Sequence, residues 1–278
     1  MKVITYNVLD GFENEPNRQD ACANWLKEQN PNIVFLNELN DFTQESLQAF
    51  ASVWGHTYCA LLKGRSAYRI AITSKTPFDY IDFHYENLVG HGLIIGETMG
   101  LTLMTTHLNP HSIKKRHQDL DFILNKISQF QLANKNIIFG GDLNSLFVGE
   151  KQYYHDDINQ MRLWSIQKNI DKPNIENVIN GELDFTLTQR IIDAGLIDLL
   201  SKFNLKYQRS YLSLLRLKEL QTDTSVIKAN LNAEKLHARI DYIWVNPTLA
   251  ETCKSCYIPT DPILENLSDH FPIIANFD

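Results

Sequence analysis

Residues 136–144 read NIIFGGDLN, an apolar run that breaks at two glycines and ends in an acid and an amide. Short apolar runs bounded by Gly, Asn or Asp are typical of buried β-strands. Asp142 and Asn144 therefore stand where this strand is expected to end. Polar groups at strand ends are held rigidly, as a binding or catalytic site requires.

The same arrangement recurs along the chain, because other apolar runs also end in, or enclose, a carboxylate, an amide or an imidazole. Each such residue alone is most often a turn or cap residue. Their recurrence at several expected strand ends favours one shared site. The residues in these positions are Asn7, Glu38, His107, Asp241, Asp269 and His270.

This set of side chains suits the hydrolysis of phosphate esters. Carboxylate and amide oxygens are the ligands that Mg²⁺ prefers. Two histidines can take up or release a proton near neutral pH, and a carboxylate such as Asp241 commonly orients a catalytic imidazole. A bound metal ion neutralises charge on the phosphate while a base prepares the attacking water.

The remaining pattern predicts a layered α+β domain with two packed sheets covered by helices. Helical spacing of apolar residues predicts helices at 17–29, after the N-cap Ser112, and at 188–201. The expected strands are 2–8, 33–36, 58–62, 70–73, 80–83, 93–96, 101–106, 136–139, 240–245 and 272–275.

The chain of 278 residues is expected to form a single domain, 1–278, with an insertion-rich region at about 146–236. That region is polar and lacks clean periodicity, so we expect long loops with one or two helices. Its aromatic stretches at 153–155 and 207–213 are candidates either for a substrate pocket or for packing within the insertion. The net charge of −7 argues weakly against binding nucleic acid over the whole surface.

The first residues, MKVITYNV, enter a strand pattern directly, and no apolar run approaches the roughly 18 residues of a membrane span. We therefore expect no integral membrane segment and a cytoplasmic protein, although a signal removed before residue 1 would leave no trace. The lone C-x-x-C at Cys253 and Cys256 lacks the second pair of a structural zinc site. Nothing indicates a coiled coil, and we expect a monomer.

Six runs resemble, in order, motifs of the endonuclease/exonuclease/phosphatase superfamily, which includes DNase I-like and exonuclease III-like enzymes. They span nearly the whole chain. The resemblance implies a four-layer α/β sandwich, in which two packed mixed sheets are flanked by helices and the site lies at one edge of the sheets. The runs are TYNVLDG (5–11), LNEL (36–39), THL (106–108), GDLN (141–144), RIDYI (239–243) and SDHFP (268–272).

The resemblance also implies a site for Mg²⁺, with Mn²⁺ as the alternative. Glu38 matches the main metal-binding glutamate, Asp269 resembles a second carboxylate near the metal, and Asn7 resembles the asparagine that supports both metal and substrate. Some relatives carry an aspartate two residues after that asparagine. Here that place is Leu9, and Asp10 is one residue further on.

The remaining matches carry expected catalytic roles. Asp142 and Asn144 match the pair that prepares the attacking water and contacts the scissile phosphate. His107 matches a phosphate-contacting or acid histidine. Asp241 and His270 resemble a pair in which the aspartate holds the ring. Whether Asp142 or His270 is the general base stays open at this point.

The basic run at 114–117 has two interpretations. It is either the solvated face of a helix or a set of cations that holds a substrate phosphate. Arg116 is the candidate for substrate binding, because the superfamily often has an arginine after this loop.

The substrate is left open among several classes. The first is a phosphodiester of nucleic acid or a nucleotide, which would make the chain a nuclease or phosphodiesterase. The second is a phosphomonoester or a sphingomyelin-type head group, with inositol phosphates included. The remote alternative is an inactive scaffold, which the presence of all the matched residues disfavours.

Overall fold

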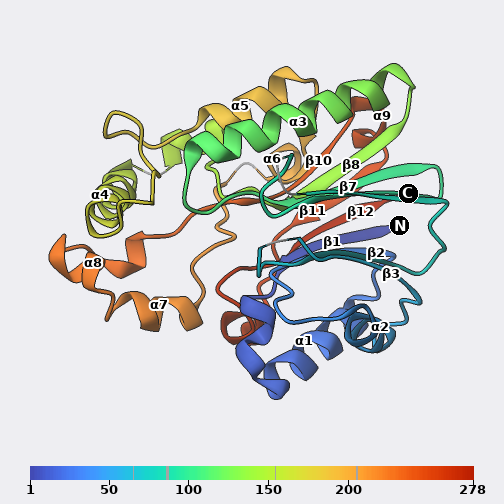
Figure 1. Ribbon diagram of the computed structural model, residues 1–278, viewed down its shortest axis with the longest axis horizontal. Coiled ribbons are helices and arrows are strands. Elements are labelled where there is room, and N and C mark those ends of the chain that lie inside the picture. The colour runs from blue at the N-terminus through green and yellow to red at the C-terminus, as the bar shows by residue number, and fades with distance from the viewer. Residues whose placement is uncertain (65, 86–87, 154, 205) are drawn as a thin grey trace.

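The strand-like runs of the sequence pair into two six-stranded sheets in the computed structural model, which describes residues 1–64, 66–85, 88–153, 155–204 and 206–278 (Figure 1). The first sheet has the order β11-β12-β1-β2-β4-β3, formed by Cys253–Tyr257, Ile273–Phe277, Lys2–Asn7, Ile33–Asn37, Ile70–Ser74 and Tyr58–Leu62. The second has the order β5-β6-β7-β8-β10-β9, formed by Tyr80–His84, Leu93–Thr98, Leu101–His107, Asn136–Asp142, Asp241–Val245 and Ile197–Asp198.

These sheets confirm the predicted four-layer architecture. Helices α1 (Pro16–Gln29) and α2 (Gln44–Ser52) cover the outer face of the first sheet, and α3 (Ile113–Leu132) and α5 (Thr186–Asp193) cover that of the second (Figure 1). Strands β2, β4, β7 and β10 are buried along their whole length, as expected when both faces of a sheet are covered.

One parallel strand pair in each sheet positions polar residues at a common edge. In the first sheet β1 runs parallel to β2, with Asn7 opposite Asn37. In the second, β7 runs parallel to β8, with His107 opposite Asp142. Because the carboxyl ends of neighbouring parallel strands meet at one sheet edge, all four residues come together there.

The two glycines of the NIIFGGDLN run let this edge pack closely. A Cβ atom at Gly140 would lie 3.0 Å from Cδ2 of Phe35 in the facing sheet. Gly141 has φ +132°, and a Cβ atom there would lie 2.0 Å from the carbonyl oxygen of Thr106. Both contacts exclude a larger residue, so the break in the apolar run brings β8 close to its neighbours.

The predicted helices at 17–29 and after Ser112 are confirmed as α1 and α3, and the Ser112 hydroxyl accepts a hydrogen bond from the Lys115 amide. The single helix predicted at 188–201 is wrong. Gly195, with φ +83°, ends the turn after α5, and the chain continues as β9 and then α6 (Leu199–Phe203). The Asp198 side chain caps α6 by accepting from the Ser201 amide.

The region at 146–236 contains more helix than predicted. It holds α4 (His155–Asp171), α5, α6, α7 (Leu214–Leu220) and α8 (Thr224–Lys228), with short 3-10 turns η2 (Val148–Tyr153) and η3 (Ala233–Lys235). Most of these helices are too short to show a 3.6-residue period. Helices α4, α7 and α8 gather to one side of the sheets (Figure 1) around an apolar cluster that includes Met161, Trp164 and Leu212. We call these three helices the insert helices.

The other short elements are η1 (Asp10–Asn14), α9 (Pro247–Ala250) and η4 (Pro262–Asn266). The cysteines of the C-x-x-C run lie buried and free in β11. In the part of the chain that the structure describes, no helix is long and apolar enough to cross a membrane.

Candidate active site

The polar residues expected at strand ends converge at one edge of the sandwich. Oxygen or nitrogen atoms of Glu38, His107 and Asp142 lie within 4.8 Å of one another, and so do those of Asp142, Asp241 and His270. Asp142 belongs to both groups and joins them into one cluster. The second sheet supplies Asp142 from β8 and Asp241 from β10, where the two residues pair in register.

Asn7 lies between two of the acidic side chains. Its Nδ2 donates to Glu38 Oε1 and to Asp142 Oδ2, each at 3.0 Å, and its Oδ1 accepts from the Leu9 amide. Asn7 therefore faces the site with its amide nitrogen. In this orientation Asn7 positions the two carboxylates, and its own oxygen is turned away from a metal ion bound between them.

Glu38 is held in place by the backbone around it. It adopts φ +61°, an uncommon conformation for a residue with a side chain, and such strain clusters at functional sites. Its Oε2 accepts from the Asp10 amide at 3.0 Å. The Asp10 carboxylate itself accepts from Asn40 Nδ2 at 2.6 Å.

Asp142 is fixed by two asparagines. Its amide donates to Asn37 Oδ1, and its Oδ1 accepts from the Asn144 amide at 2.8 Å. The Asn144 side chain donates to the Leu108 carbonyl, which ties it to the end of β7. Asn37 also donates to the Thr106 carbonyl and so links the two sheets at the site. This role of Asn37 was not predicted, although the residue lies within the LNEL run (36–39).

Buried acids at this edge are costly without a positive partner. Burial and the nearby Asp269 raise the pKa of Glu38 to about 7. Burial is also the main cause that raises the pKa of Asp142 to about 8, with Asp241 and Glu38 adding to it. Two crowded carboxylates beside an imidazole fit a hard divalent cation, which would offset their repulsion.

His270 and Asp241 form a buried pair. His270 Nδ1 lies 2.7 Å from Asp241 Oδ2, and Nε2 points toward Asp142 Oδ2 at 3.7 Å and Asp269 Oδ1 at 3.9 Å. Burial disfavours the charged ring, but Asp241, Asp269 and Asp142 outweigh it and raise the pKa of His270 well above its usual range.

The loop before β12 is fixed by Ser268. Its hydroxyl donates to the Asn7 carbonyl at 2.7 Å and accepts from the His270 amide at 3.1 Å. This bridge joins the end of β1 to the loop before β12, so the position of His270 follows that of Asn7. In the second sheet, the Ser210 hydroxyl accepts from the Asp241 amide.

His107 lies on the other side of Asp142. Its Nε2 is 3.5 Å from Asp142 Oδ2 and 3.8 Å from Glu38 Oε1, and neither ring nitrogen has a hydrogen-bond partner among the described residues. Its ring stacks on His91 at 5.1 Å and meets the edge of Tyr68. Burial, followed by the nearby His91 and His270, lowers the pKa of His107 well below its usual range. The ring is therefore neutral near pH 7.

Of the basic run at 114–117, Lys114 and Lys115 are exposed, whereas Arg116 is buried. Arg116 donates to the Asn109 carbonyl and to Asn177 Oδ1, and its Nε has no hydrogen-bond partner among the described residues. Burial lowers the pKa of Arg116 to about 10, so the side chain remains a cation.

Asp269, expected as a metal ligand, belongs to neither of the two groups found among the described residues. Its Oδ1 lies 3.3 Å from the Ser268 hydroxyl oxygen and faces His270.

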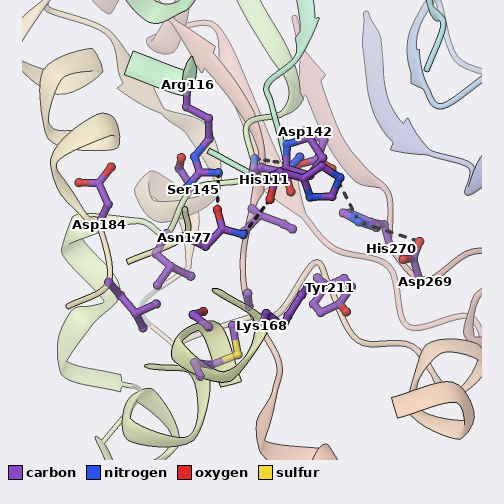
Figure 2. Close-up of a pocket in the computed structure, with 18 of the residues that line it drawn as sticks. His111, Arg116, Asp142, Ser145, Lys168, Asn177, Asp184, Tyr211, Asp269 and His270 are labelled. Carbon is purple, nitrogen blue, oxygen red and sulfur yellow. Dashed lines mark hydrogen bonds and ion pairs between the residues drawn. The ribbon is translucent and has the colours of Figure 1, made fainter. Parts of the chain in front are cut away.

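A cavity of about 260 Å³ connects these residues to helices α4 and α7 (Figure 2). Its wall includes the site residues Glu38, Asp142, Asn144, Asp269 and His270, together with Arg116. The part of the wall that helices α4 and α7 supply was not predicted, because neither helix was predicted. That part includes Met161, Trp164, Lys168 and Arg216.

Of the aromatic stretches proposed for a pocket, Tyr211 lines this cavity. Tyr154 and the side chains of Tyr153 and His155 lie outside the part of the chain that the structure describes.

Comparison with protein families gives one match that spans nearly the whole chain. Residues 4–270 match the model of the Endonuclease/Exonuclease/phosphatase family. No curated protein matches the sequence significantly.

Solved structures share the fold at low sequence identity. An AP endonuclease from Archaeoglobus fulgidus superimposes with a TM-score of 0.67 at 21% identity, over 100% of this chain and 99% of that one. A 3′ phosphatase from Neisseria, bound to a product DNA hairpin, gives 0.65 at 17% over 100% and 99%. A 3′–5′ exonuclease from Neisseria meningitidis gives 0.63 at 18% over 100% of both chains. At these identities the likeness establishes the fold alone.

Proposed function

This chain belongs to the endonuclease/exonuclease/phosphatase family and thus, in general terms, to the phosphoester hydrolases, and we propose that it is a divalent-metal-dependent phosphodiesterase that acts on nucleic acid or a nucleotide derivative. One observation carries this proposal. Asp142 belongs both to the group that it forms with Glu38 and His107 and to the group that it forms with Asp241 and His270, and the ligand atoms of each group lie within 4.8 Å of one another. Candidate metal ligands and a candidate proton acceptor thus lie around one point.

Glu38 and Asp142 would hold the metal ion, which we propose to be Mg²⁺, with Mn²⁺ as the alternative. Asp269 is the further carboxylate that borders the site, and Asn7 bridges Glu38 and Asp142 by donating from its amide nitrogen to both. A bound divalent ion would neutralise charge on the phosphate oxygens of the substrate.

The remaining site residues would transfer the proton and contact the phosphate during hydrolysis. The attacking water gives its proton to Asp142, or to His270 once a bound cation has offset the carboxylates that keep the ring protonated; Asp241 holds this ring in orientation. Asn144 and Arg116 contact the scissile phosphate from the cavity wall. The unpaired ring nitrogens of His107 allow it to hydrogen-bond a phosphate oxygen as a neutral imidazole.

We favour a phosphodiester of nucleic acid as the substrate because two of the similar structures are described as an AP endonuclease and a 3′–5′ exonuclease. A phosphomonoester is the second candidate, because the cavity of about 260 Å³ is bounded by helices α4 and α7 and suits a small substrate. One of the similar structures is described as a 3′ phosphatase.

The experiment is a hydrolysis panel run with Mg²⁺ and with EDTA. The substrates are bis-p-nitrophenyl phosphate, p-nitrophenyl phosphate, supercoiled plasmid, abasic-site duplex, single-stranded RNA, an inositol polyphosphate and sphingomyelin. We expect turnover of at least one diester with Mg²⁺, loss of that turnover in EDTA, and recovery when Mg²⁺ is restored, because Glu38 and Asp142 need a cation to hold the phosphate.

Two other outcomes would contradict the proposal. Turnover that persists unchanged in EDTA would remove the metal from the mechanism. The absence of turnover with either Mg²⁺ or Mn²⁺, together with no binding of metal in calorimetry, would favour an inactive scaffold.

A further inference from the structure

Positive side chains from the insertion lie in the cavity wall, beyond the metal-ligand end, which is the part of the wall that holds Glu38 and Asp142. Lys168 comes from α4, Arg216 from α7 and Tyr211 from the segment before α7, and all three line the cavity. In the view of Figure 2, Lys168 and Tyr211 lie below Asp142, apart from Arg116 at the top. We call these three residues the insert subsite.

Lys168 forms no salt bridge among the described residues, although the Asp223 carboxylate is near enough to favour its charge. Its Nζ lies 4.2 Å from the centroid of the Trp164 ring, and among the described residues it makes no hydrogen bond or ion pair. Burial, with the nearby Arg216 and Lys172 adding to it, outweighs the opposing effect of Asp223 and lowers the pKa of Lys168 to about 8. A half-buried ammonium group without an ion-pair partner is costly unless a ligand supplies a closer negative charge.

Arg216 connects this cation to the catalytic residues. Its Nε donates to the Tyr211 hydroxyl at 3.2 Å, and one of its terminal nitrogens pairs with Glu219. The Tyr211 ring meets the His270 ring edge-on, with 5.3 Å between centroids. A ligand held by the insert subsite therefore lies next to the Asp241–His270 pair.

The acidic groups in the cavity wall are already committed elsewhere. Asp184 accepts from the Thr186 hydroxyl and lies 2.8 Å from His117 Nε2. The other carboxylates of the wall, Glu38, Asp142 and Asp269, belong to the proposed metal-binding end. The wall is thus divided into an acidic end that fits a metal ion and a cationic part that fits an anion.

We propose that the insert subsite binds a second anionic group of the substrate, a phosphate or a carboxylate, while the scissile phosphate lies at Glu38 and Asp142. This inference rests on the proposed function. It narrows the substrate to phosphate esters with a second negative group that reaches Lys168 within the same cavity. That group is either part of a small molecule or the neighbouring phosphate of a single nucleic-acid strand.

The test compares adenosine 3′,5′-bisphosphate with adenosine 5′-monophosphate by calorimetric titration with Ca²⁺ in place of Mg²⁺, so that Glu38 and Asp142 keep a cation. Chromatography of the titrated samples checks that neither nucleotide is hydrolysed. We expect the bisphosphate to bind at least about tenfold more tightly, the effect of one charge-assisted contact. Lys168→Met keeps the length of the side chain over Trp164 and should remove this tenfold difference. Lys172→Met removes a positive charge from an exposed residue one turn later and should retain it.

Equal affinity for the two nucleotides, or an unchanged preference in Lys168→Met, would overturn the insert subsite. Arg216→Gln should also reduce the preference for the bisphosphate. It provides a second test of the insert subsite if the Lys168→Met protein does not fold. Titration with a single-stranded tetranucleotide identifies the source of the anion. If Lys168→Met weakens binding of the tetranucleotide, the natural ligand is a nucleic-acid strand. If Lys168→Met weakens binding of the bisphosphate alone, the natural ligand is a small molecule. Binding needs no hydrolysis, so the wild-type hydrolysis panel tests the proposed function separately.

Discussion

Replacing His270 with alanine is expected to lower kcat/KM by about 10³-fold, within the range that a positioned proton-transfer group contributes. His270 is buried, its Nδ1 is fixed by Asp241 at 2.7 Å, and its Nε2 points into the cluster toward Asp142. Whether this ring takes the proton of the water or stabilises the phosphate as a cation, the variant loses that contact. Steady-state kinetics on the diester that the wild type hydrolyses best provide the measurement.

Two further variants make this result interpretable. Asp241→Asn leaves the ring in place but removes the charge that orients it, so activity should fall in the same direction. His84→Ala removes a histidine of β5 that pairs with Asp82, away from the site, and should leave kcat/KM unchanged. Full activity in a folded His270→Ala protein would refute the role proposed for the pair.

Replacing Arg239 with alanine is expected to lower the free energy of unfolding by about 3–5 kcal/mol, the cost of leaving buried charges without a partner. Arg239 is fully buried; its Nε lies 2.8 Å from Glu150 Oε1 and its Nη1 lies 3.0 Å from Asp198 Oδ2. The guanidinium also lies over the rings of Phe147 and Tyr242. Urea denaturation of the wild type and the variant measures the change.

Lys254→Ala is the control for this stability prediction. Lys254 pairs with Asp278 at the surface, both side chains are more than half exposed, and such pairs contribute little. The stability of this variant should stay close to that of the wild type. If Arg239→Ala lowers the free energy of unfolding by less than about 1 kcal/mol, Glu150 and Asp198 find other partners or water. That result would contradict a buried ion-pair network of Arg239, Glu150 and Asp198.

The fold was predictable where burial on both faces makes a strand uniformly apolar. The runs around Val3, Phe35 and Ile138 therefore stand out in the sequence, and their strands were predicted. Strands β11 and β9 were not predicted. β11 is the edge strand CKSCY with exposed and half-buried polar residues, and β9 has two residues, so neither shows a clean pattern.

The residues of the metal-ligand end were predictable because each stands at a strand end that the sequence marks. Their hydrogen bonds were not. The orientation of Asn7, with its nitrogen toward Glu38 and Asp142, depends on the Leu9 amide, which only the folded turn supplies. Lys168 and Arg216 were missed for a different reason. They lie on helices that pack through a small separate apolar cluster, and helices as short as α7 carry too few turns for a readable period.

The central claim is that a divalent cation binds at Glu38 and that hydrolysis depends on it. Calorimetric titration with Mg²⁺, compared between the wild type and Glu38→Gln, tests it most directly, with exposed Glu28→Gln as the control. We expect the Glu38 variant to bind Mg²⁺ at least about tenfold more weakly, because even outer partners of metal ligands have effects of that size, and to lose hydrolysis in parallel. Unchanged Mg²⁺ affinity with full hydrolysis in Glu38→Gln would contradict the claim.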